Sequence, residues 1–138
     1  MKNEMEQFAK MSATKNKGVT EECLQETEQL LAVVIDEQYK ALVKLVNAAE
    51  YGEWCFYPIK DKRNLKKTFD DVVRNTQLKR AEKLPPQFFA IAENGTGNFL
   101  CMKSDESAIY HQNHEQESPE KFFSDLKEFI THAEEFET

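Results

Sequence analysis

One stretch of the chain, residues 88–112, restricts its fold more than any other. It holds three short apolar runs, and the polar segments between them are rich in Gly, Asn, Asp and Ser. Runs of this length and composition are typical of β-strands, and the intervening residues are those that turns use. We therefore expect strands at 88–92, 98–103 and 108–112, with turns at 93–97 and 104–107. Strands joined by short turns pair antiparallel, so the stretch predicts an antiparallel meander.

The first of these turns contains Gly95-Thr96-Gly97, which resembles the start of a phosphate-binding loop. Such loops need either a third glycine before a helix or a lysine followed by Ser or Thr. Here Leu100 stands at the third glycine position and a strand is expected to follow. We interpret the segment as a hairpin turn in which Asn94-Gly95 supplies positive φ angles.

Helical spacing appears on both sides of this meander. Thr20 and Asp36 are candidate N-caps, and the second precedes apolar residues at i, i+3, i+4 and i+7: Tyr39, Leu42, Val43 and Val46. A third helix is predicted from the spacing of Leu65, Phe69, Val72 and Val73. A closing helix is predicted from Ser118 as cap and Pro119 as first residue, with an apolar stripe at Phe122, Leu126, Phe129, Ile130 and Ala133.

The aromatic run from Glu53 to Ile59 predicts a further strand. Helices gathered around an antiparallel sheet of about four or more strands give an α+β fold. The length of 138 residues suits one domain. We expect an arm or short helix at 1–18, anchored by Met5, Phe8 and Met11, and a single domain at 19–138.

Charge is distributed unevenly along the chain. The net charge is −7, yet residues 60–83 hold nine basic and four acidic residues, so the rest carries −12. Residues 105–138 alone carry −8. Phosphate recognition needs clustered Lys and Arg, so nucleic acid is not an expected partner. An acidic surface attracts a basic partner, although such charge can also serve solubility alone.

The sequence gives no sign of a membrane or secreted protein. No apolar run approaches the length of a membrane span, and the first residues lack the apolar centre of a secretion signal. Three cysteines at wide spacing argue against a disulfide framework, which favours a cytoplasmic location.

The stretch IYHQNHE, residues 109–115, raises the question of a metal site. His111 and His114 would point to opposite faces of a strand, and their spacing with Glu115 matches no zinc pattern. Cys55 and Cys101 are the other tempting ligands, but both lie in predicted strands, where free cysteines are usually buried. We expect a strand end entering an exposed loop, with no metal, cofactor or catalytic set.

Residues 89–101, FAIAENGTGNFLC, resemble the phe-x-ile-ala-x-asn-gly-x-gly-asp-x-x-cys strand pair of the SUKH superfamily. Residues 108–110 with His114-Glu115 resemble its next strand and asp-his-glu ending. The resemblance extends over about 20–131. Two departures stand out: Asp36 replaces a usual proline, and Asn47-Ala48-Ala49 replaces asparagine and two glycines, so that turn is expected to be built differently.

The resemblance implies an α+β fold and a non-enzymatic role. Bacterial members resemble immunity proteins that neutralise a toxin of the same cell, often a nuclease, whereas eukaryotic members are regulatory scaffolds. We therefore expect a cytoplasmic bacterial immunity protein that binds a basic toxin stoichiometrically, itself a monomer or weak dimer. A scaffold module, or a metal enzyme that uses His111 and His114, are the alternatives.

Seven residues are candidates for partner contact: Glu53, Trp54, Asp105, Glu106, His111, His114 and Glu115. Tryptophan is frequent among interface hot spots when exposed, but a tryptophan on a strand is equally often part of the core. Whether the basic 60–83 segment contacts a partner stays open.

Overall fold

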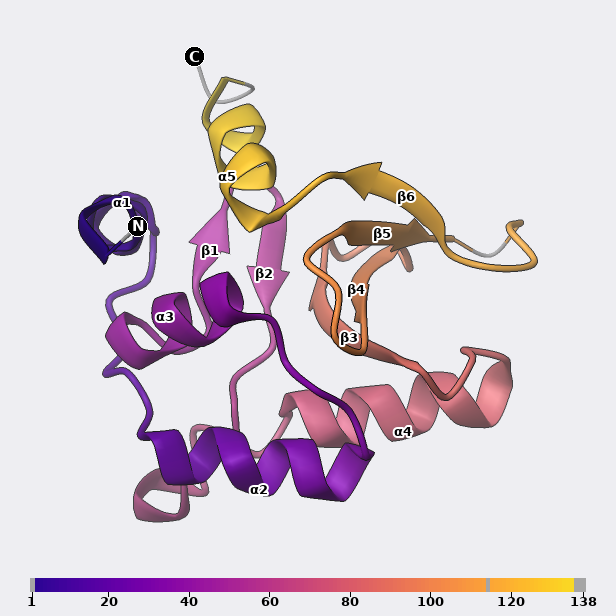
Figure 1. Cartoon of the computed structure of the whole chain (residues 1–138), viewed down its shortest axis with the longest axis horizontal. Coiled ribbons are helices and arrows are strands. Elements are labelled where there is room, and N and C mark those ends of the chain that lie inside the picture. Colours follow the sequence, from indigo (N-terminus) through magenta and orange to yellow (C-terminus); the bar gives the residue numbers. More distant parts are fainter. Residues whose placement is uncertain (1, 114, 136–138) are drawn as a thin grey trace.

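A six-stranded antiparallel sheet surrounded by helices forms the molecule (Figure 1), in a computed structural model that describes residues 2–113 and 115–135. Along the described chain the elements are α1 (Lys2–Met11), α2 (Glu21–Leu31), α3 (Glu37–Leu45), β1 (Glu50–Tyr51), β2 (Trp54–Phe56), the 3₁₀ turn η1 (Lys62–Asn64), α4 (Val72–Glu82), β3 (Phe88–Glu93), β4 (Phe99–Lys103), β5 (Ile109–Gln112), β6 (Glu120–Phe123) and α5 (Leu126–Glu135). The predicted α+β class is confirmed.

The sheet is a simple meander in which strands pair in chain order from β1 to β6, each antiparallel to the next. The three strands expected at 88–112 are therefore confirmed as β3, β4 and β5. The turn between β3 and β4 is a hairpin, as predicted, although its positive φ angles belong to Gly95 and Gly97. Asn94 contributes its side chain instead, which accepts a hydrogen bond from the Thr96 N–H at 3.1 Å.

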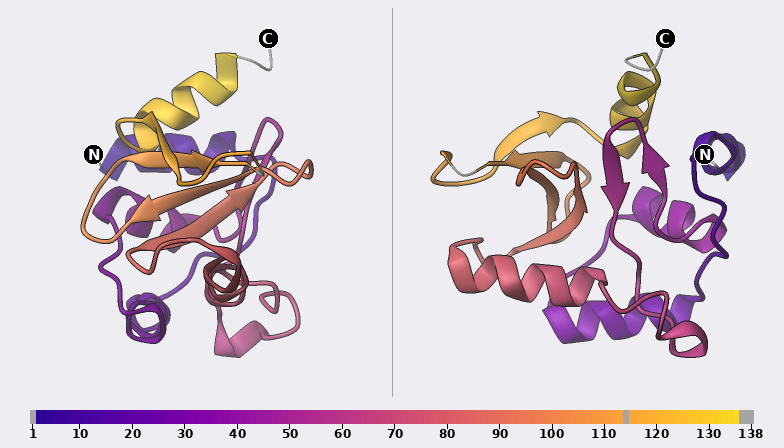
Figure 2. Two further views of the ribbon diagram at one scale, coloured as in Figure 1. Left: turned by 90° about the vertical axis from the view of Figure 1, so that its right-hand side faces the viewer. Right: turned by 180° about the vertical axis from the view of Figure 1, so that it is seen from behind.

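The sheet curls strongly. In a flat sheet β2 and β5, with two strands between them, would stand about 14 Å apart. The rings of Trp54 on β2 and His111 on β5 nevertheless lie 6.0 Å apart, centroid to centroid. The inner face of the curl is therefore concave, and its two ends approach each other near α5 (Figures 1 and 2).

Helices cover both faces of the sheet. The rings of Tyr39 from α3 and Phe129 from α5 lie against Phe56 on the concave face, at centroid distances of 6.4 and 5.9 Å. On the other face, α4 packs on β3, where the Ala90 N–H donates to Thr76 Oγ1 at 2.9 Å. Figure 2 shows α2 beside α4 at one end of the molecule.

The first segment covers the outer edge of β1. Met5 and Phe8 of α1 are buried, and α1 packs on α3. The Ala13 N–H donates to the Glu50 carbonyl at 2.9 Å, and the Glu50 N–H donates to Ser12 Oγ at 2.9 Å. Backbone groups of this edge strand are thus paired by the chain itself, which protects them from pairing with other molecules.

The two predicted N-caps of α2 and α3 are confirmed. Thr20 Oγ1 accepts from the Cys23 N–H at 3.4 Å, and Asp36 Oδ2 accepts from the Tyr39 N–H at 3.0 Å. After α3, Ala48 has a φ of 54°, a conformation that glycine adopts more easily. Asn47 closes this turn, because its amide bonds both the N–H and the carbonyl of Ile59.

The third helix was predicted to start too early. It begins at Val72, capped by Asp71, whose Oδ1 accepts from the Arg74 N–H at 2.8 Å. The residues before it form η1 and turns, and Leu65 and Phe69 are exposed rather than on a buried helical face. Side chains that bond the local backbone compete with helix formation, and this segment contains several of them.

The closing helix was also placed too early, because residues 120–123 form strand β6 against β5. Asp125 caps the helix instead of Ser118, accepting from the Glu128 N–H at 2.9 Å. The predicted stripe is buried from Leu126 onward, whereas Phe122 belongs to the strand.

The strand predicted at 53–59 is shorter than expected. It is β2, which forms a hairpin with β1, and Cys55 in it is exposed rather than buried as expected.

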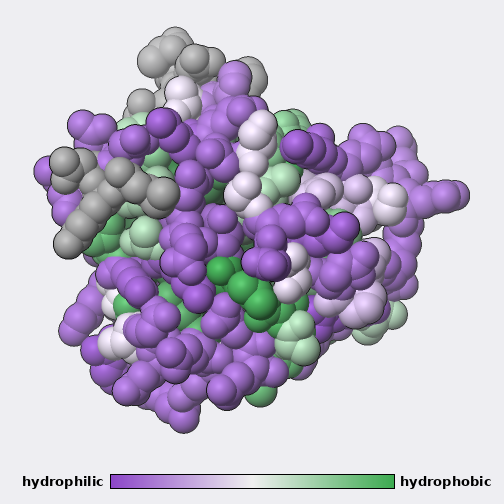
Figure 3. All heavy atoms as spheres, in the orientation of Figure 1, coloured by the Kyte–Doolittle hydropathy of each residue, from purple (hydrophilic) through white to green (hydrophobic). Residues whose placement is uncertain are grey.

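Figure 3 shows that the face seen in Figure 1 is largely hydrophilic, with a small hydrophobic area near its middle. Within the described part of the chain no helix combines the length and the apolar character that crossing a membrane requires.

Candidate functional site

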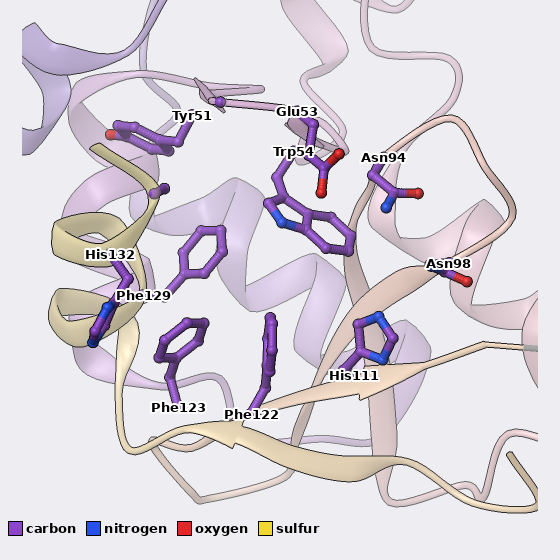
Figure 4. A pocket seen from close by; sticks show the side chains of 12 residues that line it. Tyr51, Glu53, Trp54, Asn94, Asn98, His111, Phe122, Phe123, Phe129 and His132 are labelled. Atoms are coloured by element: carbon purple, nitrogen blue, oxygen red, sulfur yellow. The ribbon is translucent and has the colours of Figure 1, made fainter. Parts of the chain in front are cut away.

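A hollow lined largely by aromatic side chains lies where the ends of the curled sheet approach each other (Figure 4). Its volume is about 650 Å³. We call it the aromatic groove, and its lining comes from the β1–β2 hairpin, the β3–β4 turn, β5, β6 and α5: Tyr51, Gly52, Glu53, Trp54, Asn94, Asn98, His111, Phe122, Phe123, Phe129, His132 and Ala133.

A β-bulge in β6 explains why two successive phenylalanines face this groove. Ile109 pairs with Phe123 and Tyr110 pairs with Lys121, so Phe122 is an extra residue on the β6 side. Side chains of a regular strand alternate between faces, and a bulge breaks this alternation and redirects a side chain. Figure 4 accordingly shows Phe122 and Phe123 pointing the same way, into the groove.

The β1–β2 hairpin brings Trp54 to the opposite side of the groove. Tyr51 pairs with Trp54, so only Gly52 and Glu53 form the turn. Gly52 has a φ of 58°, and two-residue hairpin loops require such a positive angle. The short turn leaves Glu53 exposed at the groove and directs Trp54 toward β5.

The rings form a continuous aromatic network from one side of the groove to the other. Trp54 meets His111 edge to face, His111 lies 5.2 Å from Phe122, and the Phe122 and Phe123 centroids are 4.5 Å apart. Phe123 then reaches Phe129 at 5.6 Å, which joins the network to the core. Trp54 is 8% exposed and Phe122 is 46% exposed. The groove therefore exposes apolar surface, mainly of Phe122, on rings that are packed against the core.

The rim of the groove is polar and carries negative charge. Glu53 is exposed beside Trp54, and Glu120 is exposed on β6, opposite His111 in the β5–β6 register. The amides of Asn94 and Asn98 complete the lining on the side of the β3–β4 turn. An apolar side chain that is flanked by Lys or Arg would match both the floor and the rim.

The structure brings three of the seven predicted contact residues together at this groove: Glu53, Trp54 and His111. Trp54 was expected to be either a contact residue or a core residue, and it has features of both: its ring is mostly buried and yet lines the groove. His114 lies outside the described residues. Glu115 is exposed in the loop between β5 and β6 and does not line the groove.

Asp105 and Glu106 lie elsewhere, in the turn between β4 and β5. This turn is at the opposite end of β4 from the Asn98 side of the groove. The Asp105 N–H donates to the Val34 carbonyl at 2.9 Å, and Glu106 pairs with Lys103 at 3.5 Å. The structure therefore places these two acids away from the candidate site.

Sequence reasoning missed the groove residues of β6 and α5. Phe122 and Phe123 were assigned to a helix, although two adjacent aromatic residues are also typical of a strand. The burial of Phe129 was predicted correctly, but its position beneath the aromatic groove was not predicted. The bulge that turns Phe122 inward has no signal in the sequence, so the groove could not be assembled without the structure.

Aromatic rings and side-chain amides make up most of the lining of the groove. Among the described residues no group of three or more His, Cys, Asp or Glu side chains could hold a metal ion. Burial, followed by the charges of Glu50 and Glu93, raises the pKa of Cys55, and burial raises that of Cys101. Both thiols are therefore less readily ionised than an ordinary cysteine, and thiolate is the nucleophilic form.

Comparison with known proteins agrees with this description. The model of the SMI1-KNR4 cell-wall family, SUKH_5, matches residues 1–136. A search among curated proteins found no match. The family match covers almost the whole chain, including α1, and its domains are consistent with immunity or protein-interaction roles and generally non-enzymatic. The chain belongs to the SMI1-KNR4 cell-wall (SUKH_5) family of the SUKH superfamily.

Proposed function

We propose that this protein is a cytoplasmic bacterial immunity protein that neutralises a protein toxin, a nuclease being the favoured class, by stoichiometric binding. The toxin contacts the aromatic groove and its acidic rim. Membership of the SUKH superfamily and the aromatic groove support this role.

The observation that carries the proposal is the supported, partly exposed aromatic network. Binding energy in interfaces concentrates in a few aromatic residues that sit in well-packed, desolvated positions. Trp54 is already well packed, Phe122 is partly exposed, and both line the groove and contact His111. An apolar side chain of a partner would bury their remaining exposed area without reorganising the core.

Charge supports the proposed class of partner. A nuclease holds phosphate, so its active cleft is basic, and the chain outside residues 60–83 carries a net charge of −12. Glu53 lines the groove, and Glu120 is paired with the groove residue His111 in the β5–β6 register. Complementary charge raises the rate of association, and an inhibitor must reach a toxin before the toxin finds its substrate.

Co-expression tests this proposal. The protein is produced together with the toxin domain that is encoded beside its gene, and growth and co-purification are measured. We expect growth to be restored and a complex of one chain of each to be recovered. If the neighbouring gene product is toxic and the protein neither restores growth nor co-purifies with it, the proposal is contradicted.

A matched pair of variants locates the contact. Phe122→Ala removes an exposed groove ring and should weaken the complex at least about tenfold. Phe69→Ala removes a more exposed ring outside the groove and should leave affinity unchanged. Equal affinities for both variants would show that the toxin binds another face.

The second candidate function is a regulatory scaffold for another protein, as in the eukaryotic members that the sequence resembles. The same groove would serve as its contact surface. Growth decides between them: a scaffold would co-purify with its partner but would not protect cells from a toxin.

A further inference from the structure

The loop between β2 and α4 presents a second, contrasting surface. We call residues 60–71 the basic loop. It buries polar side chains and exposes apolar ones: Asp61 and Thr68 are 7% and 6% exposed, whereas Leu65 and Phe69 are 52% and 71% exposed. This reverses the usual distribution, and grouped exposed apolar side chains mark interaction sites.

Hydrogen bonds hold this loop in its conformation. Thr68 Oγ1 accepts from the Asp61 N–H at 3.1 Å and donates to the Asn64 carbonyl at 2.9 Å. Both oxygens of Asp61 accept from the Arg63 guanidinium at 3.1 Å. Lys62 reaches Glu26 of α2 at 3.2 Å, which ties the loop to the body of the molecule. The exposed apolar side chains are thus presented by an ordered segment.

Phe69 is positioned in the same way. The Arg74 guanidinium lies over its ring, 5.4 Å from the centroid, and is itself bonded to Asp70 at 2.7 Å. Beside the ring is a shallow hollow of about 380 Å³, to which Leu65 and Lys60 also contribute. A partner can therefore contact both apolar side chains at once.

Positive charge surrounds these apolar residues. Lys60, Lys66 and Lys67 are exposed, and none of them pairs with a carboxylate within 4.0 Å in the described part of the chain. A partner for the basic loop thus needs an apolar recess with acidic residues at its rim.

The aromatic groove has both properties. Its lining is largely aromatic and includes the exposed Glu53, and the exposed Glu120 lies on β6 opposite the groove residue His111 in the register. The basic loop is located near α2 and α4, whereas the groove is located between β1–β2, β6 and α5 on another side of the molecule (Figure 1). One chain cannot bring its own loop to its own groove, so the match must be made between two molecules.

We propose that a second copy of this chain is the occupant: Phe69 and Leu65 of one copy enter the aromatic groove of the next, with Lys66 and Lys67 facing Glu53 and Glu120. The contact is head to tail, so association proceeds without a two-fold axis. The inference is linked to the proposed function because both use the same groove. A toxin that binds the groove would displace the second copy.

A bilayer or nucleic acid fits the loop less well. Both are extended anionic surfaces, and the charge of −12 outside residues 60–83 would be repelled by them. A second copy places two of these acidic residues, Glu53 and Glu120, opposite lysines of the loop, so that the contact itself is attractive.

Sedimentation velocity of the whole chain tests the proposal. Between about 10 μM and about 1 mM protein, a range suited to weak complexes, we expect the average mass to rise in about 50 mM salt. The rise should be smaller in about 500 mM salt, which screens exposed charges. A monomer at every concentration in low salt would overturn the proposal.

Complementing variants test the head-to-tail geometry. Phe69→Ala lacks the projecting ring but keeps the groove, and Phe122→Ala lacks a groove ring but keeps the loop. Each alone should associate at least about tenfold more weakly than wild type. An equimolar mixture should form pairs that do not grow further, because one intact loop meets one intact groove. A mixture that stays monomeric, or single variants that associate like wild type, would overturn the proposal.

Leu78→Ala is the matched control, since Leu78 is 50% exposed on α4 and lines neither surface. It should associate like wild type. Growth rescue separates the two proposals: Phe69→Ala should lose self-association and still protect cells. If the toxin fails to bind while wild type still self-associates, only the proposed function is wrong.

Discussion

The aromatic groove and the basic loop use the same kinds of residue in opposite ways. In the groove, Trp54 of β2 and Phe122 and Phe123 of β6 turn inward, and Phe123 rests on Phe129, which is 1% exposed. In the loop, polar side chains occupy the interior and Phe69 points outward, with Arg74 over its ring. The comparison shows that backbone geometry, rather than composition, decides whether a phenylalanine becomes part of a recess or of a projection.

The largest expected effect is at the floor of the groove. Phe129→Ala removes a buried ring that contacts Phe56 and Phe123, and should lower the free energy of unfolding by about 3–5 kcal/mol. Urea denaturation measures this effect. A loss below about 1 kcal/mol would show that the groove is not packed on the core. The groove and the basic loop would then not differ in how their aromatic side chains are supported.

The next effect is at the interior of the basic loop. Thr68→Val keeps the shape of the side chain but leaves the buried Asp61 N–H without its acceptor, so stability should fall by about 1–3 kcal/mol. Thr131→Val is the control, because the Thr131 hydroxyl bonds the Lys127 carbonyl at an exposed position. Equal losses for both variants would mean that the loop has no ordered polar interior.

The cap that ends the loop should show a smaller effect with a dependence on pH. Asp71→Ala removes the N-cap of α4 and should cost about 1 kcal/mol, whereas Asp71→Asn keeps a capping oxygen. Burial raises the pKa of Asp71, so the folded state binds a proton more readily than the unfolded state. The contribution of Asp71 to the free energy of unfolding of the wild type therefore falls as the pH rises from the ordinary carboxyl pKa through the raised pKa of the folded state.

Asp71→Asn cannot ionise, so its stability relative to wild type should be highest above that pH window and should decrease below it. Denaturation midpoints of both proteins at several pH values between about 3 and about 7 measure the difference. A relative stability that changes in the opposite direction would show that the folded protein favours the ionised carboxylate.

The smallest effects are at the two exposed rings. Phe69→Ala should change the free energy of unfolding by no more than about 0.5 kcal/mol, as is usual for exposed positions. Phe122→Ala should cost about 1 kcal/mol, because the ring also contacts His111 and Phe123. Denaturation of both variants beside wild type checks this order. A reversed order would mean that Phe69 is packed and not presented.

Local signals in the sequence predicted much of the fold. Turn residues between apolar runs placed β3, β4 and β5, and Thr20 and Asp36 capped their helices as expected. Prediction failed where local and distant interactions compete. Ser118-Pro119 indicates a helix start, but pairing with β5 makes residues 120–123 a strand. The spacing of Leu65 and Phe69 indicates a helix, but bonds to Asp61 and Thr68 shape a loop.

The sequence by itself determined the α+β class, the meander, the family resemblance and the unequal distribution of charge, because each depends on neighbouring residues or on composition. Only the tertiary structure decided which residues meet at a surface. It brought Glu53, Trp54 and His111 to one groove and left Asp105 and Glu106 outside it. The reason is that the curl of the sheet and the bulge at Phe122 arise from strand pairing between residues far apart in the chain.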